Sequence, residues 1–357
     1  MSVTEIRIGQ RCIGLNYPSY FIADIAANHD GNLSRAKDLI HLCAEAGADA
    51  AKFQNFQAET IVSEFGFRAL GQMAHQASWK KSVFEVYKQA SVDLEWTETL
   101  KKTCIEAGVE YLTTPYSLEL VNRLSPFVCA WKLGSGDITW HELIETLAKE
   151  KKPLLIATGA STMAEVEAAV DVARRYHDQI VLMQCNTNYT GSVENFHYVA
   201  LNVLKVYSRK FPDLVLGLSD HTPGLSATLG AVALGARVIE KHFTDDNLRE
   251  GPDHIFSMNP KAWREMVDRT RELEAALGRE EKRIMDNEKD SVVVQRRAVR
   301  AARHLLPGEI LTEQDLIPLR PCPEEGLPPF RAIDLVGRRV AKKISIGDLV
   351  TFSKLED

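Results

Sequence analysis

Ionisable and hydroxyl-bearing side chains gather at the ends of eight short apolar runs in the first 290 residues. The runs, each typical of a buried β-strand, are Phe21–Ala27, Ala51–Phe56, Tyr111–Tyr116, Ala130–Ser135, Pro153–Thr158, Ile180–Cys185, Leu214–Ser219 and Arg237–Phe243. The polar residues at or just after their ends are Asp24, Asn28, His29, Lys52, Gln54, Thr113, Thr114, Lys132, Ser135, Asp137, Thr158, Gln184, Asn186, Tyr189, Ser219, Asp220, His221, Glu240, His242 and Asp245. Because an unpaired buried charge costs several kcal/mol, this pattern predicts that the strand ends converge on one polar centre, an active site.

Two lysines, Lys52 and Lys132, stand among these residues together with several hydroxyl groups. A phosphate or carboxylate group needs point positive charges and hydroxyl or backbone donors around it. The combination therefore indicates an anionic substrate. The alternative for each lysine alone is a buried ion pair with an acidic neighbour.

Two histidines, His221 and His242, end adjacent predicted strands, so that their imidazoles can point into one cavity. Two neutral imidazoles with nearby carboxylates form a plausible divalent-metal site, and hydrogen-bonded structural histidines are the alternative. Asp253 lies in the Gly/Pro loop Glu250–His254, which follows the eighth run. Its carboxylate is suited to a polyol hydroxyl, or else to capping a turn.

Helical periodicity fills the intervals between the strand-like runs. Apolar residues from Ala36 to Cys43 recur at i, i+3, i+4 and i+7, and Gly47 can end that helix. Thr162–Glu165 has the pattern of a capping box. Asn259 and Pro260 are typical of an N-cap and first helical position, ahead of an apolar stripe that ends near Gly278.

Eight strand–helix units predict an α/β fold with a parallel sheet, and the continuous apolar strands suit burial on both faces. The count and span favour a (β/α)8 TIM barrel over an open doubly wound sheet. No Gly-x-Gly-x-x-Gly follows the first strand, which weakens the dinucleotide-binding alternative. The residues before Phe21 could form a hairpin that plugs the bottom of the barrel.

Composition narrows the class further. The 357 residues are 45% hydrophobic and 26% charged with a net charge of −6, which predicts a large core and makes nucleic acid an unfavoured main partner. No apolar run reaches the length of a signal peptide core or a membrane span, so a cytoplasmic protein without membrane partners is expected. The six cysteines form no C-x-x-C pair and are expected to be reduced.

The residue composition and pattern of the sequence change near the end of the chain. Residues 279–290 carry dense charge, and the last 67 residues have short strands, Gly turns and Pro stops. We predict a barrel domain over residues 1–285 with its N-terminal hairpin, a linker over 286–293 and a small domain over 294–357. A domain of that size is expected to lean on the barrel or on a partner subunit.

Taken together, these motifs resemble the sialic acid synthase family, which includes N-acetylneuraminate synthase and its legionaminic acid, pseudaminic acid and spore-coat relatives. The matching stretches are IADIAANHDG (22–31), AKFQ (51–54), LTTPYS (112–117), WKLGSGD (131–137), GLSDHTPG (217–224) and EKHFTDDNLREGPDHIFSMNP (240–260). The stretches LLPGEILTEQDLIPLRP and LVGRRVAKKISIGDLV resemble the family's antifreeze-like (SAF) domain. The resemblance covers essentially the whole chain.

The resemblance implies a reaction in which phosphoenolpyruvate condenses with the open-chain aldehyde of an N-acylated hexosamine such as N-acetylmannosamine. Water adds, phosphate leaves, and a nine-carbon 2-keto-3-deoxy acid forms with the help of Mn²⁺ or Mg²⁺. By position, His221 and His242 resemble the metal ligands. Lys52, Thr114, Lys132 and Ser135 resemble the phosphoenolpyruvate cradle, with Gln54 and Thr158 as further binding residues, and Asp24, Asp137, Tyr189, Ser219 and Asp253 resemble amino-sugar contacts or proton-handling groups. Arg320 resembles an arginine inserted into the partner's active site, which implies a domain-swapped homodimer.

Three departures bear on the acceptor sugar. The family usually has glutamate where this chain has Asp24 and Asp137, and a serine is often found where Ala157 stands. The segment QCNTNYT differs from the Tyr-Pro found there in bacterial N-acetylneuraminate enzymes. A di-N-acetylated hexose giving a legionaminic- or pseudaminic-type acid therefore stays open.

Two other classes compete with a synthase. One is a Schiff-base pyruvate aldolase that uses Lys52 or Lys132 on the same barrel, which would require a lowered lysine pKa. The other is a non-catalytic carbohydrate- or ice-binding protein, suggested by the C-terminal domain alone. The polar strand ends of the barrel disfavour this second class.

Overall fold

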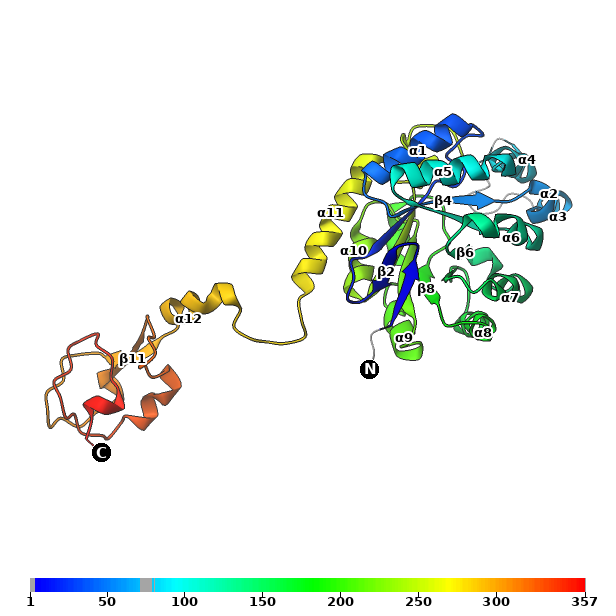
Figure 1. The fold of residues 1–357 in the computed structure, drawn as a ribbon. Helices are drawn as coiled ribbons and strands as arrows, with labels where there is room; N and C mark the ends of the chain where they lie inside the picture. The colour runs from blue at the N-terminus through cyan, green and yellow to red at the C-terminus, as the bar shows by residue number, and fades with distance from the viewer. Residues whose placement is uncertain (1–3, 71–78, 80, 357) are drawn as a thin grey trace. The chain divides into compact units, whose positions relative to one another are not determined.

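The chain forms two compact units, Met1–Gly278 and Arg279–Asp357, in a computed structural model that describes residues 4–70, 79 and 81–356 (Figure 1). Each unit has its own apolar core. The predicted linker over residues 286–293 falls inside the second unit and includes the start of helix α12 (Lys289–Gln295).

Eight parallel strands of the first unit close into a barrel, because β10 pairs with both β9 and β3. The strands are β3 (Tyr20–Asp24), β4 (Ala50–Asn55), β5 (Glu110–Pro115), β6 (Trp131–Leu133), β7 (Leu154–Ala157), β8 (Ile180–Cys185), β9 (Val215–Asp220) and β10 (Ala236–His242). This confirms the predicted (β/α)8 barrel.

Helices cover the outside of the barrel (Figure 1). They are α1 (Leu33–Glu45), α5 (Thr97–Ala107), α6 (Leu118–Leu124), α7 (His141–Lys149), α8 (Met163–Arg174), α9 (Val203–Lys210), α10 (Ser226–Ala233) and α11 (Pro260–Leu277). The described residues between β4 and α5 include the shorter helices α2 (Ala58–Ile61), α3 (Glu64–Leu70) and α4 (Val83–Ala90). The apolar stripes bury against the strands, which gives a core continuous between the two layers.

Helix starts follow the local capping signals. The Thr162 side chain accepts from the Glu165 N–H while Glu165 reaches back to the Thr162 N–H, so the predicted capping box of α8 is confirmed. Asn259 caps α11 with Pro260 at its first position, also as predicted. Gly47 follows the end of α1 with a φ of +96°, a conformation that favours glycine.

Several predicted strand ends were wrong by one to three residues. The first strand stops at Asp24 instead of Ala27, because the backbone turns at Ala26 with a φ of +45°. The fourth strand covers only Trp131–Leu133, because Ser135–Asp137 form a 3₁₀ turn. In both places the polar residues therefore sit on turns that leave the barrel wall.

A β-hairpin precedes the barrel. Strands β1 (Glu5–Ile8) and β2 (Arg11–Gly14) pair antiparallel. The side chains of Ile6, Ile8 and Ile13 pack in one apolar cluster with inward-facing residues of the barrel strands, among them Tyr20 and Val238. The hairpin therefore fills the end of the barrel opposite the carboxyl ends of the strands.

The second unit contains α12 and a small β-rich body. Strands β11 (Ala298–Ala301) and β12 (Leu316–Leu319) pair antiparallel, and isolated bridges such as Leu305 with Ile344 complete it. Its core is a separate cluster that includes Val299, Leu311 and Val350.

Among the described residues, no helix has the length and apolar character that crossing a membrane requires. All six cysteines are free, as expected.

The hairpin should contribute strongly to barrel stability. Ile13 is fully buried, so Ile13→Ala should lower the free energy of unfolding by about 2–5 kcal/mol. Leu15, which is 58% exposed just after the hairpin, is the matched control. Leu15→Ala should change the free energy of unfolding by less than about 0.5 kcal/mol. All five tryptophans lie in the first unit, so urea unfolding followed by tryptophan fluorescence reports on the barrel. Equal effects of the two variants would contradict a packing role for the hairpin.

Candidate active site

Strand alternation brings the polar residues into one layer at the carboxyl end of the barrel. Asp24 lies beside Lys52 on β4 and beside His242 on β10 in the strand register. Ser219 on β9 lies beside Glu240 on β10. Since every second residue of a strand faces the same side, Glu240 and His242 share the inner face of the barrel.

Two buried lysines and two buried carboxylates form the centre of this layer. The Lys52 Nζ donates to Asp24 Oδ2 at 2.7 Å and lies 3.9 Å from Glu240 Oε1. The Lys132 Nζ lies 3.5 Å from the same Glu240 oxygen and donates to the Leu133 carbonyl at 3.0 Å. The side chains of both lysines are at most 3% exposed.

Lys52 is held in its charged form. Burial alone would lower its pKa, but the charges of Asp24 and Glu240 outweigh burial and raise the pKa above its ordinary value. The amine therefore stays an ammonium group across the neutral pH range, which suits it to holding an anion.

Glu240 is a site residue that the sequence reasoning left unassigned. Its Oε1 accepts from the Ser219 hydroxyl at 3.2 Å, whereas its Oε2 is buried without a hydrogen-bond partner. Its position two residues before His242 on one strand is the signal that could have assigned it, because that spacing places both side chains on one face.

Several of the predicted binding residues join this cluster. The Gln54 side-chain amide donates to Asp24 Oδ2 at 2.9 Å, and the Thr114 hydroxyl lies 3.5 Å from Lys52 Nζ. The Ser135 hydroxyl accepts from the Gly159 N–H at 3.0 Å. Thr158 does not join it, because its hydroxyl donates to the Met183 carbonyl and accepts from Tyr207 of α9.

Asp137 is a half-buried carboxyl group near the Lys132 ammonium. Burial raises its pKa to about 6, although the charge of Lys132 opposes the shift. One of its oxygens, Oδ2, has no hydrogen-bond partner. A carboxyl group with this pKa can both give and take a proton near neutral pH.

The two predicted metal ligands lie side by side. The ring centroids of His221 and His242 are 5.4 Å apart, and the Tyr189 ring lies 4.4 Å from that of His221. The His221 Nδ1 is 3.0 Å from the Asn186 carbonyl, which orients that ring. Burial, reinforced by the charges of His221 and Lys52, lowers the pKa of His242 well below its ordinary value, so its imidazole is neutral.

The donor set fits a partly open metal site. The buried His242 Nδ1 has no hydrogen-bond partner and lies 3.8 Å from Asp253 Oδ2. In the part of the chain that the structure describes, no three His, Cys, Asp or Glu side chains are grouped closely enough to hold an ion by themselves. The imidazoles of His221 and His242, each of which binds a metal only without its proton, would therefore need water or substrate oxygens to complete the coordination of a divalent cation.

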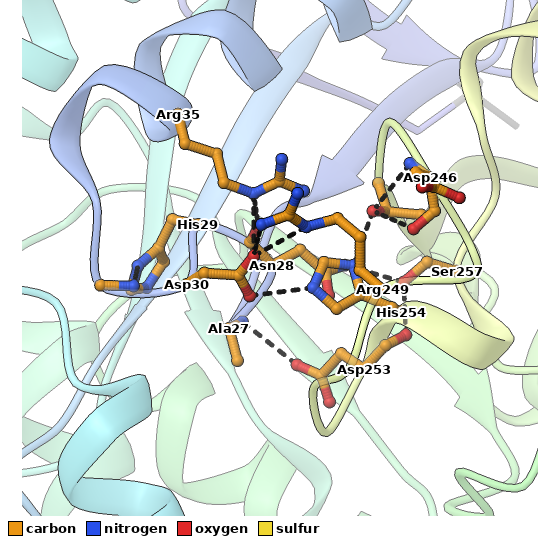
Figure 2. Close-up of polar contacts among 12 residues, drawn as sticks. Ala27, Asn28, His29, Asp30, Arg35, Asp246, Arg249, Asp253, His254 and Ser257 are labelled. Atoms are coloured by element: carbon orange, nitrogen blue, oxygen red, sulfur yellow. Dashed lines mark hydrogen bonds and ion pairs between the residues drawn. The ribbon is translucent and has the colours of Figure 1, made fainter.

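Asp253 reaches the site from the loop after β10. Its Oδ2 accepts from the Ala27 N–H at 3.1 Å, a contact shown in Figure 2. Burial raises its pKa to about 6, and the Ala27 N–H opposes that shift. The loops after β3 and β10 thus meet at this carboxylate.

Arg320 belongs to the C-terminal unit, where it is exposed and directly follows β12. In the barrel, a set of predicted residues is connected by contacts that pass through Glu240, and Asp137 lies near Lys132. The set is Asp24, Lys52, Gln54, Thr114, Lys132, Ser219, His221, His242, Tyr189 and Asp253. Ser135 contacts Gly159 instead.

Two protein-family models match this chain, one over most of the barrel and one over most of the C-terminal unit. Residues 39–282 match the model of the NeuB family and residues 296–356 match that of the SAF domain. The N,N'-diacetyllegionaminic acid synthase of Legionella pneumophila is 34% identical over 349 residues, which are 96% of each chain. The human N-acetylneuraminate-9-phosphate synthase is 30% identical over 345 residues, which are 95% of this chain and 93% of that protein.

Solved structures agree with the sequence relatives. The N-acetylneuraminic acid synthetase of Leptospira borgpetersenii, in complex with citrate, superposes with a TM-score of 0.71 at 27% identity, over 81% of this chain and 95% of that one. The spore coat polysaccharide biosynthesis protein SpsE of Bacillus subtilis gives a TM-score of 0.65 at 30% identity over 99% of both chains. The chain belongs to the NeuB family and carries a C-terminal SAF domain.

Proposed function

We propose that this chain is a cytoplasmic synthase that joins phosphoenolpyruvate to the open-chain aldehyde of an N-acylated amino sugar. The enol carbon of phosphoenolpyruvate attacks the aldehyde carbon, water adds at the phosphate-bearing carbon, and phosphate leaves. The product is a nine-carbon 2-keto-3-deoxy sugar acid. The names of the relatives from Legionella and human support this reaction class.

The pair of buried ammonium groups carries the proposal. Glu240 lies 3.9 Å from Lys52 and 3.5 Å from Lys132, which is too long for strong hydrogen bonds, so both lysines keep N–H donors for a substrate anion. The phosphate and carboxylate of phosphoenolpyruvate match two point charges flanked by Thr114 and Ser135.

The carboxylates of the cluster suit the charge that develops during the reaction. Attack by the enol leaves positive charge at the phosphate-bearing carbon, which the buried carboxylates of Asp24 and Glu240 can offset. Asp137, with its pKa of about 6, can take the proton of the attacking water. Tyr189, Ser219 and Asp253 would then contact the amino sugar.

His221 and His242 would hold Mn²⁺ or Mg²⁺, completed by water and substrate oxygens. When bound, such an ion acts as a Lewis acid on the aldehyde oxygen. The two imidazoles, the Tyr189 ring and Asp253 would place the aldehyde beside Asp24, whose Oδ2 lies 3.7 Å from His242 Nε2 and 2.7 Å from Lys52 Nζ.

A Schiff-base aldolase is the less favoured alternative. An imine-forming lysine must lose its proton, whereas the pKa of Lys52 is raised by Asp24 and Glu240. Borohydride reduction in the presence of pyruvate should accordingly leave the mass of the protein unchanged. A stable adduct on Lys52 or Lys132 would favour the aldolase.

Phosphate release tests the proposal and narrows the acceptor. We expect phosphate from phosphoenolpyruvate only when a suitable amino sugar is present. N-acetylmannosamine and 2,4-diacetamido hexoses should be compared, because the family usually has glutamate where this chain has Asp24 and Asp137, so that two carboxylates of the site are each shorter by one methylene. Phosphate release from none of these sugars, with Mn²⁺ or Mg²⁺ present, would contradict the function.

Removal of the metal ligands should abolish turnover. His221→Ala should lower kcat by at least about 100-fold, since Lewis-acid stabilisation is worth several kcal/mol. Electron paramagnetic resonance of added Mn²⁺ should show loss of the bound ion in the same variant. His141→Ala, at the exposed start of α7, is the control and should bind the ion as the wild type does. Unchanged Mn²⁺ binding by His221→Ala would remove the assignment.

Arg320 is the proposed contribution of a partner subunit. Its guanidinium could bind planar oxygens or the N-acyl carbonyl of the sugar with its forked donors. We propose a domain-swapped homodimer in which each SAF domain supplies Arg320 to the other barrel.

Subunit mixing tests this exchange. Arg320→Ala and His221→Ala homodimers should each be nearly inactive. Each heterodimer formed by unfolding and refolding an equal mixture should contain one intact site of its two, if each site is shared between subunits. Because random exchange makes half of the dimers heterodimers, the mixture should have about a quarter of wild-type activity. No recovery in confirmed heterodimers would show that Arg320 does not act across subunits.

A further inference from the structure

The loops after β3 and β10 are joined by a network of polar contacts at the rim of the site, which Figure 2 shows. The first loop carries Asp30, and the second carries Arg249 and His254. The two residues of the central contact, Asp30 and His254, are 224 positions apart in the sequence. We name this network the rim clasp and define it by Asp30, Arg249, His254 and Thr244.

Asp30 is the acceptor at its centre. Its Oδ1 lies 2.9 Å from His254 Nε2, and its Oδ2 accepts two hydrogen bonds from Arg249 at 2.7 and 2.9 Å. Burial would raise the pKa of Asp30, but the bonds from His254 and Arg249 lower it overall. The carboxylate is therefore ionised, and its bonds are charge-assisted.

The backbone at Asp30 is set for this contact. Its φ of +51° lies in the left-handed region, which residues other than glycine enter only when the surroundings hold them there. Aspartate tolerates this conformation better than most residues do. The turn directs the Asp30 side chain toward the loop after β10 (Figure 2).

The His254 ring is held in one orientation by its neighbours. Its side chain is fully buried, with Nδ1 at 2.7 Å from the Thr244 hydroxyl and Nε2 on Asp30. A Cβ added at Gly251 would lie 2.6 Å from the ring carbon Cδ2, so the loop can close over the imidazole only with glycine there. His254 is therefore clamped from three sides.

Asp253 is the residue immediately before this clamped histidine. Its carboxylate faces the site, 3.8 Å from His242 Nδ1, while its backbone carbonyl accepts from Ser257. The Ser257 hydroxyl in turn accepts from the Asn28 side chain at 2.8 Å. The bonds from Ala27 and Ser257 to Asp253, and from Asn28 to Ser257, restrain the position of the Asp253 carboxylate.

We infer that Asp30 and His254 are positioning residues, which hold the loop after β10 against the loop after β3 and so fix Asp253 for the amino-sugar acceptor. This inference rests on the proposed function for the identity of the acceptor. Neither residue touches the reacting atoms, and the effect of each passes through Asp253.

A double-mutant cycle tests the coupling. Asp30→Ala removes the contacts with His254 and Arg249 and should raise the KM for the acceptor sugar about tenfold, because the effect reaches the sugar only through Asp253. The KM for phosphoenolpyruvate should stay within about twofold. In an Asp253→Ala background, the same change should add less than about twofold. Asp30→Asn keeps an oxygen toward His254 and should recover part of the affinity. Additive effects in the cycle would overturn the inference.

Hydrogen–deuterium exchange separates this inference from the proposed function, since it needs no turnover. Asp30→Ala and His254→Gln should raise exchange in peptides covering residues 244–258 and at Ala27, with exchange elsewhere in the barrel unchanged. Asp213→Ala, which breaks an exposed ion pair with Arg174, is the control and should leave residues 244–258 unchanged. Unchanged exchange there in both clasp variants would refute the clasp even if the wild type proves to be an active synthase. Increased exchange in both clasp variants of a protein whose wild type consumes no phosphoenolpyruvate would refute the proposed function and leave the clasp standing.

Discussion

Buried charge at the carboxyl end of the barrel is the constraint on which the rest of the site depends. Lys52 and Lys132 are withdrawn from water, and an isolated buried ammonium group would lose its proton. Asp24 and Glu240 prevent this at Lys52, as its raised pKa records. The strand register makes the pairing possible, because it sets Asp24 beside Lys52 and Glu240 beside Ser219.

The two halves of the site, one around the lysines and one that would meet the sugar, are built from different elements. The lysine half is built on strands β4, β6 and β10, whose positions are fixed by backbone pairing and by the cores on both faces. The half that would meet the sugar draws on loops, including Asp253 and Tyr189. Relatives named as synthases of different sugar acids share about 30–34% identity with this chain.

Local signals predicted much of the fold. The eight strands, the capping box at Thr162 and the cap at Asn259 follow from periodicity and from hydrogen bonds between near neighbours. Strand ends were less predictable, since turns such as that at Ala26 depend on backbone conformations with no simple residue signature. Among candidate site residues, the Thr158 hydroxyl bonds to the Met183 carbonyl and to Tyr207, and the sequence could not indicate this because Tyr207 comes from the distant helix α9. The pairing of Asp30 with His254 could not be read from spacing, because only closure of the barrel brings β3 and β10 together.

Calorimetric titration of phosphoenolpyruvate, without sugar, tests the central claim most directly. The account predicts that Lys132→Met weakens binding by about tenfold to a hundredfold, since a charge-assisted contact to an anion is worth roughly 1.5–3 kcal/mol. Lys152→Met, which removes a lysine that contacts Ser125 and Glu150 on the outside of the barrel, should bind as the wild type does. Equal affinity of Lys132→Met and the wild type would show that the paired ammonium groups do not form the anion site.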